Sequence, residues 1–363
     1  MKRSLNFLPH LFLACALVLF WGCPKDENGD PGPNPSDDII YITDDIDAPT
    51  TWSNDYIYVI TAWDFYVKNT LTIEAGTIIK FHASDGPYLN LGGSGTLIAQ
   101  GTSSAPIIFT SLKDDAHGGD TNKDGNATSP MSGDWGAIST NGLNGSSFSY
   151  CQFLYGGRSG TTLDLFDSRT TVRNCTFAYN EGGELGSVEG ALNAAEALAG
   201  SVIQNNTFYG NKIPLTISGV IDIDNSNTFH NPADASETNK YNGIFLDWGA
   251  DIETTIRWEE TEVPFVIDDV DWWVDYTGTL ILGNNVVLKF MPDSYLNLEQ
   301  GATALSNHNG SGVAFTSIKD DSRKGDTNGD GTVTTPGAYD WGGIYDNQSG
   351  YYLAWGNIFY DSY

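Results

Sequence analysis

The sequence predicts an all-β solenoid made of two copies of one unit, and three observations support this. Four short β-compatible segments end in Phe, with Cys or Asn two residues earlier, and they end at Phe153, Phe177, Phe208 and Phe229. Their spacings are 24, 31 and 21 residues, and a variable period of this size, built from short strands and turns, fits a coiled solenoid. The 41 glycines favour short strands joined by turns. An aspartate-rich loop also occurs twice, 206 residues apart.

The recurring segments indicate how such a solenoid is filled. Each turn lays short strands on the turn below, so equivalent side chains stack in columns. The four phenylalanines form one inward column, and Cys151, Cys175, Asn206 and Asn227 form its neighbour at the strand period of two. We expect buried free thiols, because a disulfide would strain directly stacked parallel strands. The alternative is a β-sandwich, which would need hairpin turns of about two to five residues.

Segments on either side extend this pattern. Residues 71–81 and 101–111 carry similar strands, and the second copy repeats them at 280–290 and 312–317. Together with residues 135–250, the pattern resembles the right-handed parallel β-helix of the pectin-lyase-like superfamily. The resemblance implies that fold for both copies.

The duplication divides the chain into parts. These are a signal peptide (1–22), a flexible tether (23–45), a first β-helix unit (46–250) with acidic loop 113–134, and a shortened second unit (251–363) with acidic loop 319–340. The second unit ends a few residues after Phe359, the counterpart of Phe153, so its last coil lacks a visible cap. We expect this coil either to self-associate or to be protected by a feature that the sequence does not reveal.

The N-terminus has the order of a secretory signal. A basic start precedes the apolar residues 11–20, and Cys23 follows Gly22 where a cleavage site belongs. This resembles a bacterial lipoprotein signal, which implies that the Cys23 thiol receives a lipid and anchors the protein to a membrane. An ordinary signal peptide is the alternative, and Cys15 is a second candidate for the lipidated residue.

The segment after Cys23 points to the cell surface. Residues 24–27 (Pro-Lys-Asp-Glu) resemble the surface-export signal of lipoproteins in one large phylum of Gram-negative bacteria. The resemblance implies that the protein lies in the outer membrane and is exposed at the cell surface. The alternative is that these residues are a plain polar tether, which no export receptor recognises. Residues 24–38 are rich in Pro, Gly, Asn and Asp and predict a flexible spacer.

The charge balance restricts the partners. Asp and Glu number 46 against 17 Lys and Arg, giving a formal net charge of −29. This excess argues against nucleic acid, whose phosphates need a basic patch. It suits a secreted protein, a protein that binds divalent cations, or both.

The two acidic loops predict two Ca²⁺ sites. Both contain Asp-x-Asn-x-Asp-Gly, a run that gathers oxygen ligands around a tight turn, as in the first half of an EF-type loop. The bidentate Glu at the twelfth position is missing, so we expect flanking aspartates to complete the shell. The expected ligands are Asp120, Asn122, Asp124, the Asn126 carbonyl, Asp114, Asp115 and Asp134, and in the second copy Asp326, Asn328, Asp330, the Thr332 carbonyl, Asp320, Asp321 and Asp340. Oxygen ligands disfavour zinc; a solvated polar turn without metal is the alternative.

Two aromatic clusters are candidates for stacking on sugar rings. They are Trp272, Trp273 and Tyr276, and Tyr351, Tyr352 and Trp355. About half of these rings belong in the core, because neighbours on a strand point to opposite faces. No catalytic residue is assigned. Asp164 and Asp167 come closest to a polygalacturonase-like motif, but carboxylate pairs carry little information among 46 acids.

These observations favour a surface-exposed, calcium-binding lipoprotein that binds glycans or mediates adhesion without catalysis. One alternative is a polysaccharide lyase or glycoside hydrolase that acts on acidic polysaccharide at the surface where a binding protein would hold its glycan. It requires a basic residue within reach of the metal, or a carboxylate pair. Another is a scaffold subunit of an outer-membrane assembly that docks through the last coil.

Overall fold

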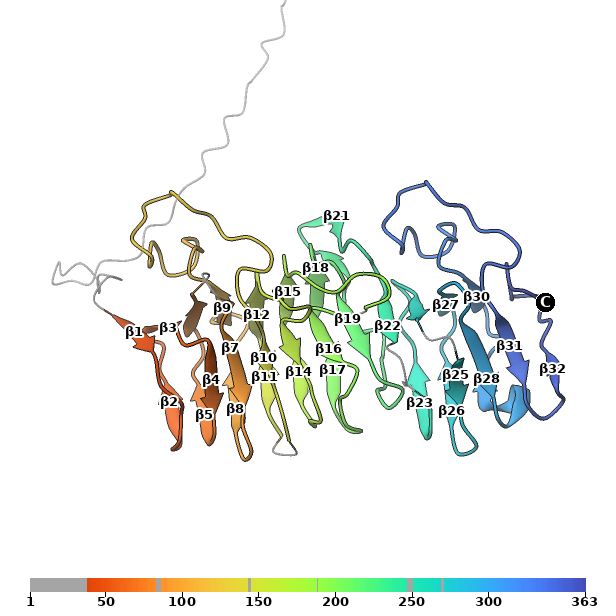
Figure 1. Ribbon diagram of the computed structural model, residues 1–363, viewed down its shortest axis with the longest axis horizontal. Coiled ribbons are helices and arrows are strands. Elements are labelled where there is room, and N and C mark those ends of the chain that lie inside the picture. Colours follow the sequence, from red (N-terminus) through yellow and green to blue (C-terminus); the bar gives the residue numbers. More distant parts are fainter. Residues whose placement is uncertain (1–37, 83–85, 143–144, 188, 247–250, 269–270) are drawn as a thin grey trace, which may run out of the picture.

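The computed structural model describes residues 38–82, 86–142, 145–187, 189–246, 251–268 and 271–363. The predicted signal peptide, Cys23 and residues 24–37 of the predicted tether lie outside these ranges. Short strands stack side by side along one long axis, as Figure 1 shows. The single helical element in the described ranges is the 3₁₀ turn η1 (Gly301–Ala304), and no helix there could span a membrane.

Three parallel sheets form the walls of the first unit. The first strand, β1 (Ile39–Ile42), lies within the predicted tether 23–45 and pairs in parallel with β3 (Ile57–Ile60), so the β-helix begins at Ile39 and not at residue 46. The seven-stranded sheet contains β1 (Ile39–Ile42), β3 (Ile57–Ile60), β6 (Ile78–Phe81), β9 (Ile107–Ser111), β12 (Cys151–Leu154), β15 (Thr176–Ala178) and β18 (Thr207–Tyr209). The six-stranded sheet contains β2 (Thr50–Trp52), β5 (Thr70–Ile73), β8 (Thr96–Gln100), β11 (Ser147–Ser149), β14 (Thr171–Arg173) and β17 (Val202–Gln204). The ten-stranded sheet contains β4 (Asp64–Val67), β7 (Tyr88–Leu91), β10 (Ile138–Ser139), β13 (Leu163–Asp164), β16 (Leu192–Ala194), β19 (Leu215–Ile217), β22 (Ile244–Leu246), β24 (Phe265–Ile267), β27 (Val287–Phe290) and β30 (Ala314–Ser317).

The remaining strands belong to the second unit and to one hairpin. One sheet contains β23 (Thr255–Trp258), β26 (Thr279–Leu282) and β29 (Leu305–Ser306); another contains β25 (Asp271–Val274), β28 (Tyr295–Leu298), β31 (Gly343–Asp346) and β32 (Tyr351–Tyr352). The antiparallel hairpin is β20 (His230–Asn231) with β21 (Asp234–Thr238). The chain visits the sheets in turn. Apart from this hairpin and β32, its strands pair in parallel with strands of neighbouring coils, which makes the fold a right-handed parallel β-helix.

The two units do not continue the same sheets. In the first unit β6 and β9 belong to the seven-stranded sheet, whereas their counterparts β27 and β30 belong to the ten-stranded sheet. Likewise β7 belongs to the ten-stranded sheet, but its counterpart β28 lies in the four-stranded one. The ten-stranded sheet therefore passes from one unit to the next, because β24 pairs with β22 (Phe265 opposite Ile244).

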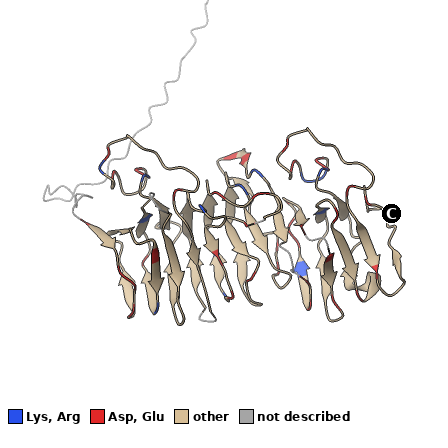
Figure 2. Cartoon of the chain, in the orientation of Figure 1, with Lys and Arg blue, Asp and Glu red and all other residues tan. Residues whose placement is uncertain are grey.

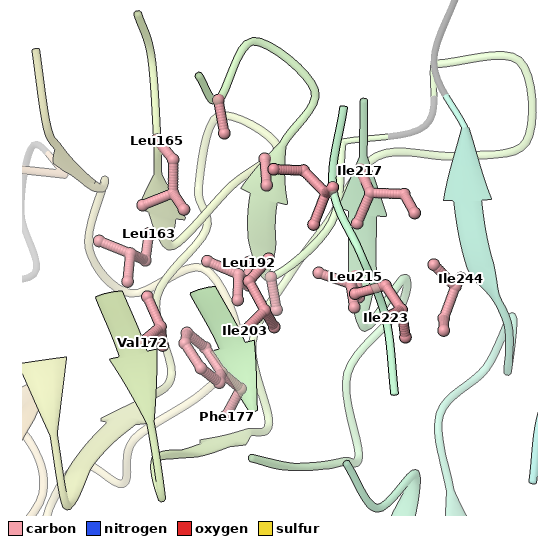
Figure 3. Close-up of a cluster of buried hydrophobic side chains, with 14 of the residues drawn as sticks. Leu163, Leu165, Val172, Phe177, Leu192, Ile203, Leu215, Ile217, Ile223 and Ile244 are labelled. Atoms are coloured by element: carbon pink, nitrogen blue, oxygen red, sulfur yellow. The ribbon is translucent and has the colours of Figure 1, made fainter. Parts of the chain in front are cut away.

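Stacked side chains fill the interior. Phe153, Phe177, Phe208 and Phe229 are fully buried, and consecutive ring centroids lie 4.7, 5.1 and 5.3 Å apart with nearly parallel planes. This confirms the predicted phenylalanine column, and Phe109 extends it at 5.1 Å. Figure 3 shows part of the same core, where Leu163, Leu192, Leu215 and Ile244 occupy equivalent positions on successive coils.

The predicted polar column is also confirmed. The Cys175 amide donates to Asn206 Oδ1, and the Asn206 amide donates to Asn227 Oδ1, both at 3.0 Å. Cys151 and Cys175 are buried free thiols. Because each buried amide finds its partners on the next coil, the column fixes which coil stacks on which.

A second asparagine ladder was not expected. Asn180, Asn211 and Asn239 follow strands at positions that the sequence marks only as turns, yet all three are buried. Asn180 Nδ2 donates to Asn211 Oδ1 at 2.9 Å, and Asn211 Nδ2 donates to Asn239 Oδ1 at 2.8 Å. Turn residues on successive coils of a solenoid lie above one another, as strand residues do. Each of these asparagines can therefore form a hydrogen bond with the asparagine on the next coil.

Residues 351–363 cover the last coil. The strand β32 pairs antiparallel with β31 and ends the parallel pairing of the four-stranded sheet. Ile358 then bridges to Phe315 on β30, and the Tyr363 ring stacks on Tyr352 with centroids 3.5 Å apart. This segment is the protective feature that the sequence did not reveal, since an antiparallel turn occupies hydrogen-bonding groups that a further coil would use.

Candidate functional site

The two acidic loops occupy equivalent places in the two units. Loop 113–134 leaves β9 and enters β10, and loop 319–340 leaves β30 and enters β31. In Figure 1 both loops project from the same long edge of the solenoid, one gold and one blue. Figure 2 shows that most of the Lys and Arg segments lie along this edge, within or beneath the loops.

Each loop brings three aspartates together. The carboxylate oxygens of Asp115, Asp120 and Asp124 lie within 4.8 Å of one another. The turn that arranges them is local: Asp120 accepts hydrogen bonds from the amides of Asp124 (3.0 Å) and Gly125 (2.8 Å). Gly125 has a φ of 69°, a conformation that glycine adopts without strain.

The second loop repeats this arrangement. The carboxylate oxygens of Asp321, Asp326 and Asp330 also lie within 4.8 Å of one another. Asp326 accepts from the Gly331 amide at 2.7 Å, just as Asp120 accepts from Gly125. A hydrogen bond from the Thr334 side chain holds the pKa of Asp330 below its ordinary value, so this carboxyl stays charged.

One carboxylate oxygen in each cluster has no hydrogen-bond partner. Asp115 Oδ1 and Asp321 Oδ1 are both shielded from solvent, and neither accepts a hydrogen bond. Burial, and then the charge of neighbouring Asp326, raise the pKa of Asp321. A buried, unpartnered oxygen beside two further carboxylates fits a hard divalent cation, which would supply the missing partner and offset the like charges.

The other expected ligands have different partners. Asp114 accepts from Thr110 Oγ1 at 2.6 Å, and Asp320 accepts from Thr316 Oγ1 at 2.7 Å. Burial would raise the pKa of Asp114, but hydrogen bonds from His117 and Thr110 hold it below its ordinary value. These two aspartates fasten each loop to its preceding strand and lie outside the three-carboxylate groups.

Asp134 and Asp340 close the loops. Asp134 accepts from Lys113 Nζ and Asp340 from Lys319 Nζ, each at 2.7 Å. The remaining expected ligands lie in the turn itself. Asn122 and Asn328 are half-buried and donate to Asp124 and Asp330 respectively, while Asn126 and Thr332 are exposed.

A buried lysine lies beneath each loop. Lys80 on β6 and Lys289 on β27 are wholly buried. Lys80 Nζ donates to the carbonyls of Asp114 and Gly119, both at 2.9 Å, and Lys289 Nζ donates to the Gly325 carbonyl at 2.7 Å. Burial lowers the pKa of Lys289 to about 8. Both ammonium groups are occupied by loop backbone, so they hold the loops and do not face a ligand.

The candidate aromatic residues separate into core and surface. Trp272 is fully buried and stacks on Trp258 with centroids 5.6 Å apart. Trp355 stacks on His308 at 3.9 Å, at the edge of the core. Tyr276 and Tyr351 are 67% and 74% exposed.

Trp273 and Tyr352 come together from the two clusters. They line a cavity of about 300 Å³ on the outer face of the four-stranded sheet, with Asp271, Tyr295, Asn297, Tyr345 and Asn347. Trp273, Asn297, Tyr345 and Tyr352 stand opposite one another on successive strands. Four aromatic rings and two amides therefore face one pocket.

The two amide side chains of this pocket differ in their hydrogen bonding. Asn297 Nδ2 donates to Asp271 Oδ1 at 3.0 Å. Asn347 Nδ2, by contrast, is buried and has no hydrogen-bond partner. Burial and the neighbouring Tyr363 raise the pKa of Tyr352, so this phenol keeps its proton. A free buried amide donor among aromatic rings suits a hydroxyl-bearing ligand.

The acids considered for catalysis do not form a pair. Asp164 lies on the outer face of the ten-stranded sheet, where its Oδ1 accepts from Asn193 at 3.2 Å. Burial raises the pKa of Asp164 to about 6. Asp167 lies in an exposed turn with a φ of 43°.

Comparison with known proteins supports the fold assignment. Residues 44–143 match the family model described as a pectate-lyase like beta helix domain. This part of the chain is similar to that family of β-helix domains. The match spans β2 to β10 and includes the whole first acidic loop. Comparisons with curated proteins and with solved structures gave no match.

Sequence reasoning missed part of the pocket in this β-helix. Tyr295, Asn297, Tyr345 and Asn347 were not expected at a binding face. One signal was available, because the run Tyr-Leu-Asn-Leu occurs at both 88–91 and 295–298. Alternation places Tyr and Asn of that run on the outer face and both leucines inside.

Proposed function

We propose that this protein is a calcium-stabilised, lipid-anchored β-helix that binds a neutral glycan at the bacterial surface without cleaving it. The pocket on the four-stranded sheet carries the proposal. The flat rings of Trp273, Tyr345 and Tyr352 suit the apolar faces of sugar rings, and Asn347 offers an unused donor to a hydroxyl.

The charge of the pocket favours a neutral ligand. Among the described residues that line it, Asp271 is the one carboxylate, and none is Lys, Arg or His. The whole chain carries a net charge of −29. A uronic acid would therefore meet repulsion and find no ion-pair partner, whereas a neutral sugar needs only rings and amides.

Binding without cleavage is favoured by what the pocket lacks. Hydrolysis of a glycosidic bond generally uses two carboxyl groups, and the described lining supplies Asp271 alone. A lyase would need an accessible base near the metal. Lys80 and Lys289 are wholly buried beneath the loops and cannot serve as that base, whereas Lys123 of the first loop is exposed. The single carboxyl group in the described lining supports a binder over the hydrolase considered from the sequence, and a search for new unsaturated ends tests the lyase.

Calcium would have a structural role in this proposal. Asp115, Asp120 and Asp124 in one loop, and their counterparts in the other, would hold one Ca²⁺ each. The partnerless oxygens of Asp115 and Asp321 support this assignment. A bound ion would lock each long loop against the solenoid by joining its start to its tight turn.

The proposed location rests on the N-terminal sequence. Cys23 would carry the lipid, and the acidic segment after it would direct the protein to the outer face of a Gram-negative outer membrane. Labelling of cells with an alkyne fatty acid should mark the parent and leave Cys23→Ala unlabelled. Equal labelling of both would remove the anchor from the proposal.

A glycan panel tests the binding function. Neutral and acidic polysaccharides would be presented with Ca²⁺ and with EDTA, and both bound protein and new chain ends would be measured. We expect binding to a neutral polymer, no new ends, and at least a tenfold loss of affinity in Trp273→Ala. The matched control is Tyr276→Ala, an exposed ring outside the pocket. New reducing or unsaturated ends would establish the enzymatic alternative, and unchanged binding by Trp273→Ala would remove the pocket from the proposal.

A further inference from the structure

The first unit repeats the floor of the pocket. On β4 and β7, Asp64 stands opposite Tyr88, and Tyr66 stands opposite Asn90. On β25 and β28, Asp271 stands opposite Tyr295, and Trp273 stands opposite Asn297. All four positions are related by the same offset of 207 residues. In both units, therefore, Asp and an aromatic residue point outward from one strand, and Tyr and Asn point outward from the strand beside it.

The two tyrosines are seated in the same way. Gly136 and Gly342 follow the buried tryptophans of the repeated Asp-Trp-Gly motif. A Cβ added at Gly136 would lie 3.0 Å from the Tyr88 ring, and one added at Gly342 would lie 2.3 Å from the Tyr295 ring. Glycine therefore leaves room for the Tyr295 ring in the second unit. In the first unit it leaves room for the Gly86 and Pro87 carbonyls, at 2.7 and 2.9 Å from such a Cβ, as well as for the Tyr88 ring.

The first-unit surface is accessible to a ligand. Asp64 and Tyr66 are exposed, Tyr66 at 39%, while Tyr88 and Asn90 are half-buried. Trp63 adds a further ring: it is 56% exposed, and its centroid lies 6.2 Å from that of Tyr88. These rings are supported from beneath by the buried Phe65 and Leu89 of the same strands.

The two surfaces differ at their C-terminal side. In the second unit, Tyr345 follows Asn297, and β32 then closes the sheet. In the first unit, Ser139 stands at the position of Tyr345, and the row continues along the solenoid to Asp164 and Asn193. The first surface is open and is lengthened by polar side chains, so it suits the middle of a polysaccharide chain. The second surface is a more enclosed pocket.

We propose that the surface formed by Asp64, Tyr66, Tyr88 and Asn90 is a second binding site for the same neutral glycan. Because β4 and β7 lie in the ten-stranded sheet and β25 and β28 in the four-stranded one, a long polymer held by both units would pass from one sheet to the other. The inference rests on the proposed function, since it assigns to the first unit the chemistry argued for the second. The expected ligand is an extended neutral polysaccharide, because two linked sites strengthen binding only to a chain that reaches both.

Stoichiometry tests this directly. The full chain with Ca²⁺ would be titrated calorimetrically with hexasaccharides of β-linked glucose, mannose and xylose, and then with the corresponding polymers. We expect two hexasaccharides per chain, the tighter in the second unit, and polymer binding at least tenfold tighter than hexasaccharide binding. Tyr66→Ala and Trp273→Ala should each reduce the stoichiometry to one and remove the polymer advantage. Tyr276→Ala should leave both unchanged.

A second measurement needs no substitution. Saturating hexasaccharide should slow amide hydrogen exchange in peptides containing β4 and β7 as well as β25 and β28. One hexasaccharide per chain, with protection confined to β25 and β28, would overturn the inference and leave the proposed function intact. Absence of binding across the whole panel would overturn both.

Discussion

The stability of the protein should depend on the protonation of one buried carboxyl group. Glu260 is wholly buried between β23 and β24. Its Oε1 accepts from the amides of Thr261 (2.7 Å) and Glu262 (2.6 Å), while its Oε2 has no partner. Burial raises the pKa of Glu260 from 4.5 to about 7; the charge of Glu262 adds to this rise, and Lys324 of the second loop opposes it.

The sign and size of the effect follow from linkage. The folded state holds the Glu260 proton more tightly than the unfolded state, so the stabilisation is complete below pH 4.5 and is lost as the pH rises to about 7. At about 1.4 kcal/mol per pKa unit, the free energy of unfolding should fall by about 3 kcal/mol across this window. Above pH 7 this contribution should change no further.

The assay is urea unfolding followed by circular dichroism between pH 4.5 and 8. Glu260→Gln keeps an acceptor for the two amides and cannot titrate. Its free energy of unfolding should therefore lack the loss of about 3 kcal/mol seen in the parent. The control is Glu259→Gln, because Glu259 is the exposed neighbour. Parallel pH profiles for the parent and Glu260→Gln would refute the reasoning, since the other acids are common to both proteins.

Three further outcomes are expected. With Ca²⁺ at about 100 times its Kd, the free energy of unfolding of the parent should exceed its value in EDTA by about 2.7 kcal/mol per site. The double variant Asp115→Asn plus Asp321→Asn should lose most of this gain, whereas the control Asp55→Asn should keep it. An equal gain in the double variant would exclude these sites. Phe177→Ala should lose about 3–5 kcal/mol in urea unfolding, because the ring is fully buried between two stacked neighbours, and Phe177→Leu should lose less. Asn211→Leu should lower stability in the same assay by more than about 3 kcal/mol, since it strips partners from four buried hydrogen bonds, and a loss under 1 kcal/mol would refute a structural role for the ladder.

The local features of the fold were predictable from the sequence. The column of Phe153 and Phe177, and the thiol and amide column beside it, followed from spacing and strand alternation. The acidic loops were located by their repetition, and Asp115, Asp120 and Asp124 do come together.

The long-range features were not predictable, for a physical reason. Every coil offers similar hydrogen-bonding edges, so the pattern does not say that β24 pairs with β22 and shifts the second unit onto a different sheet. The same limit hid the pocket, because Trp273 and Tyr352 are far apart in sequence. The burial of Lys289 was likewise hidden, because its hydrogen-bond partners come from the loop above it.

The way the first acidic loop crosses several coils bears on mechanical strength. Strands in this solenoid lie across the long axis, so a force along that axis pulls coils apart one ladder at a time. Loop 113–134 resists this separation because it forms hydrogen bonds to three successive coils. It bonds to Lys80 on the first coil and to Thr110 on the second, and the Asp134 amide donates to the Tyr155 carbonyl on the third. Its Ser132 reaches Glu181 beyond them. If the protein is anchored at its N-terminus and bears a glycan near the other end, as proposed, these bonds would protect the coils nearest the anchor from being pulled apart.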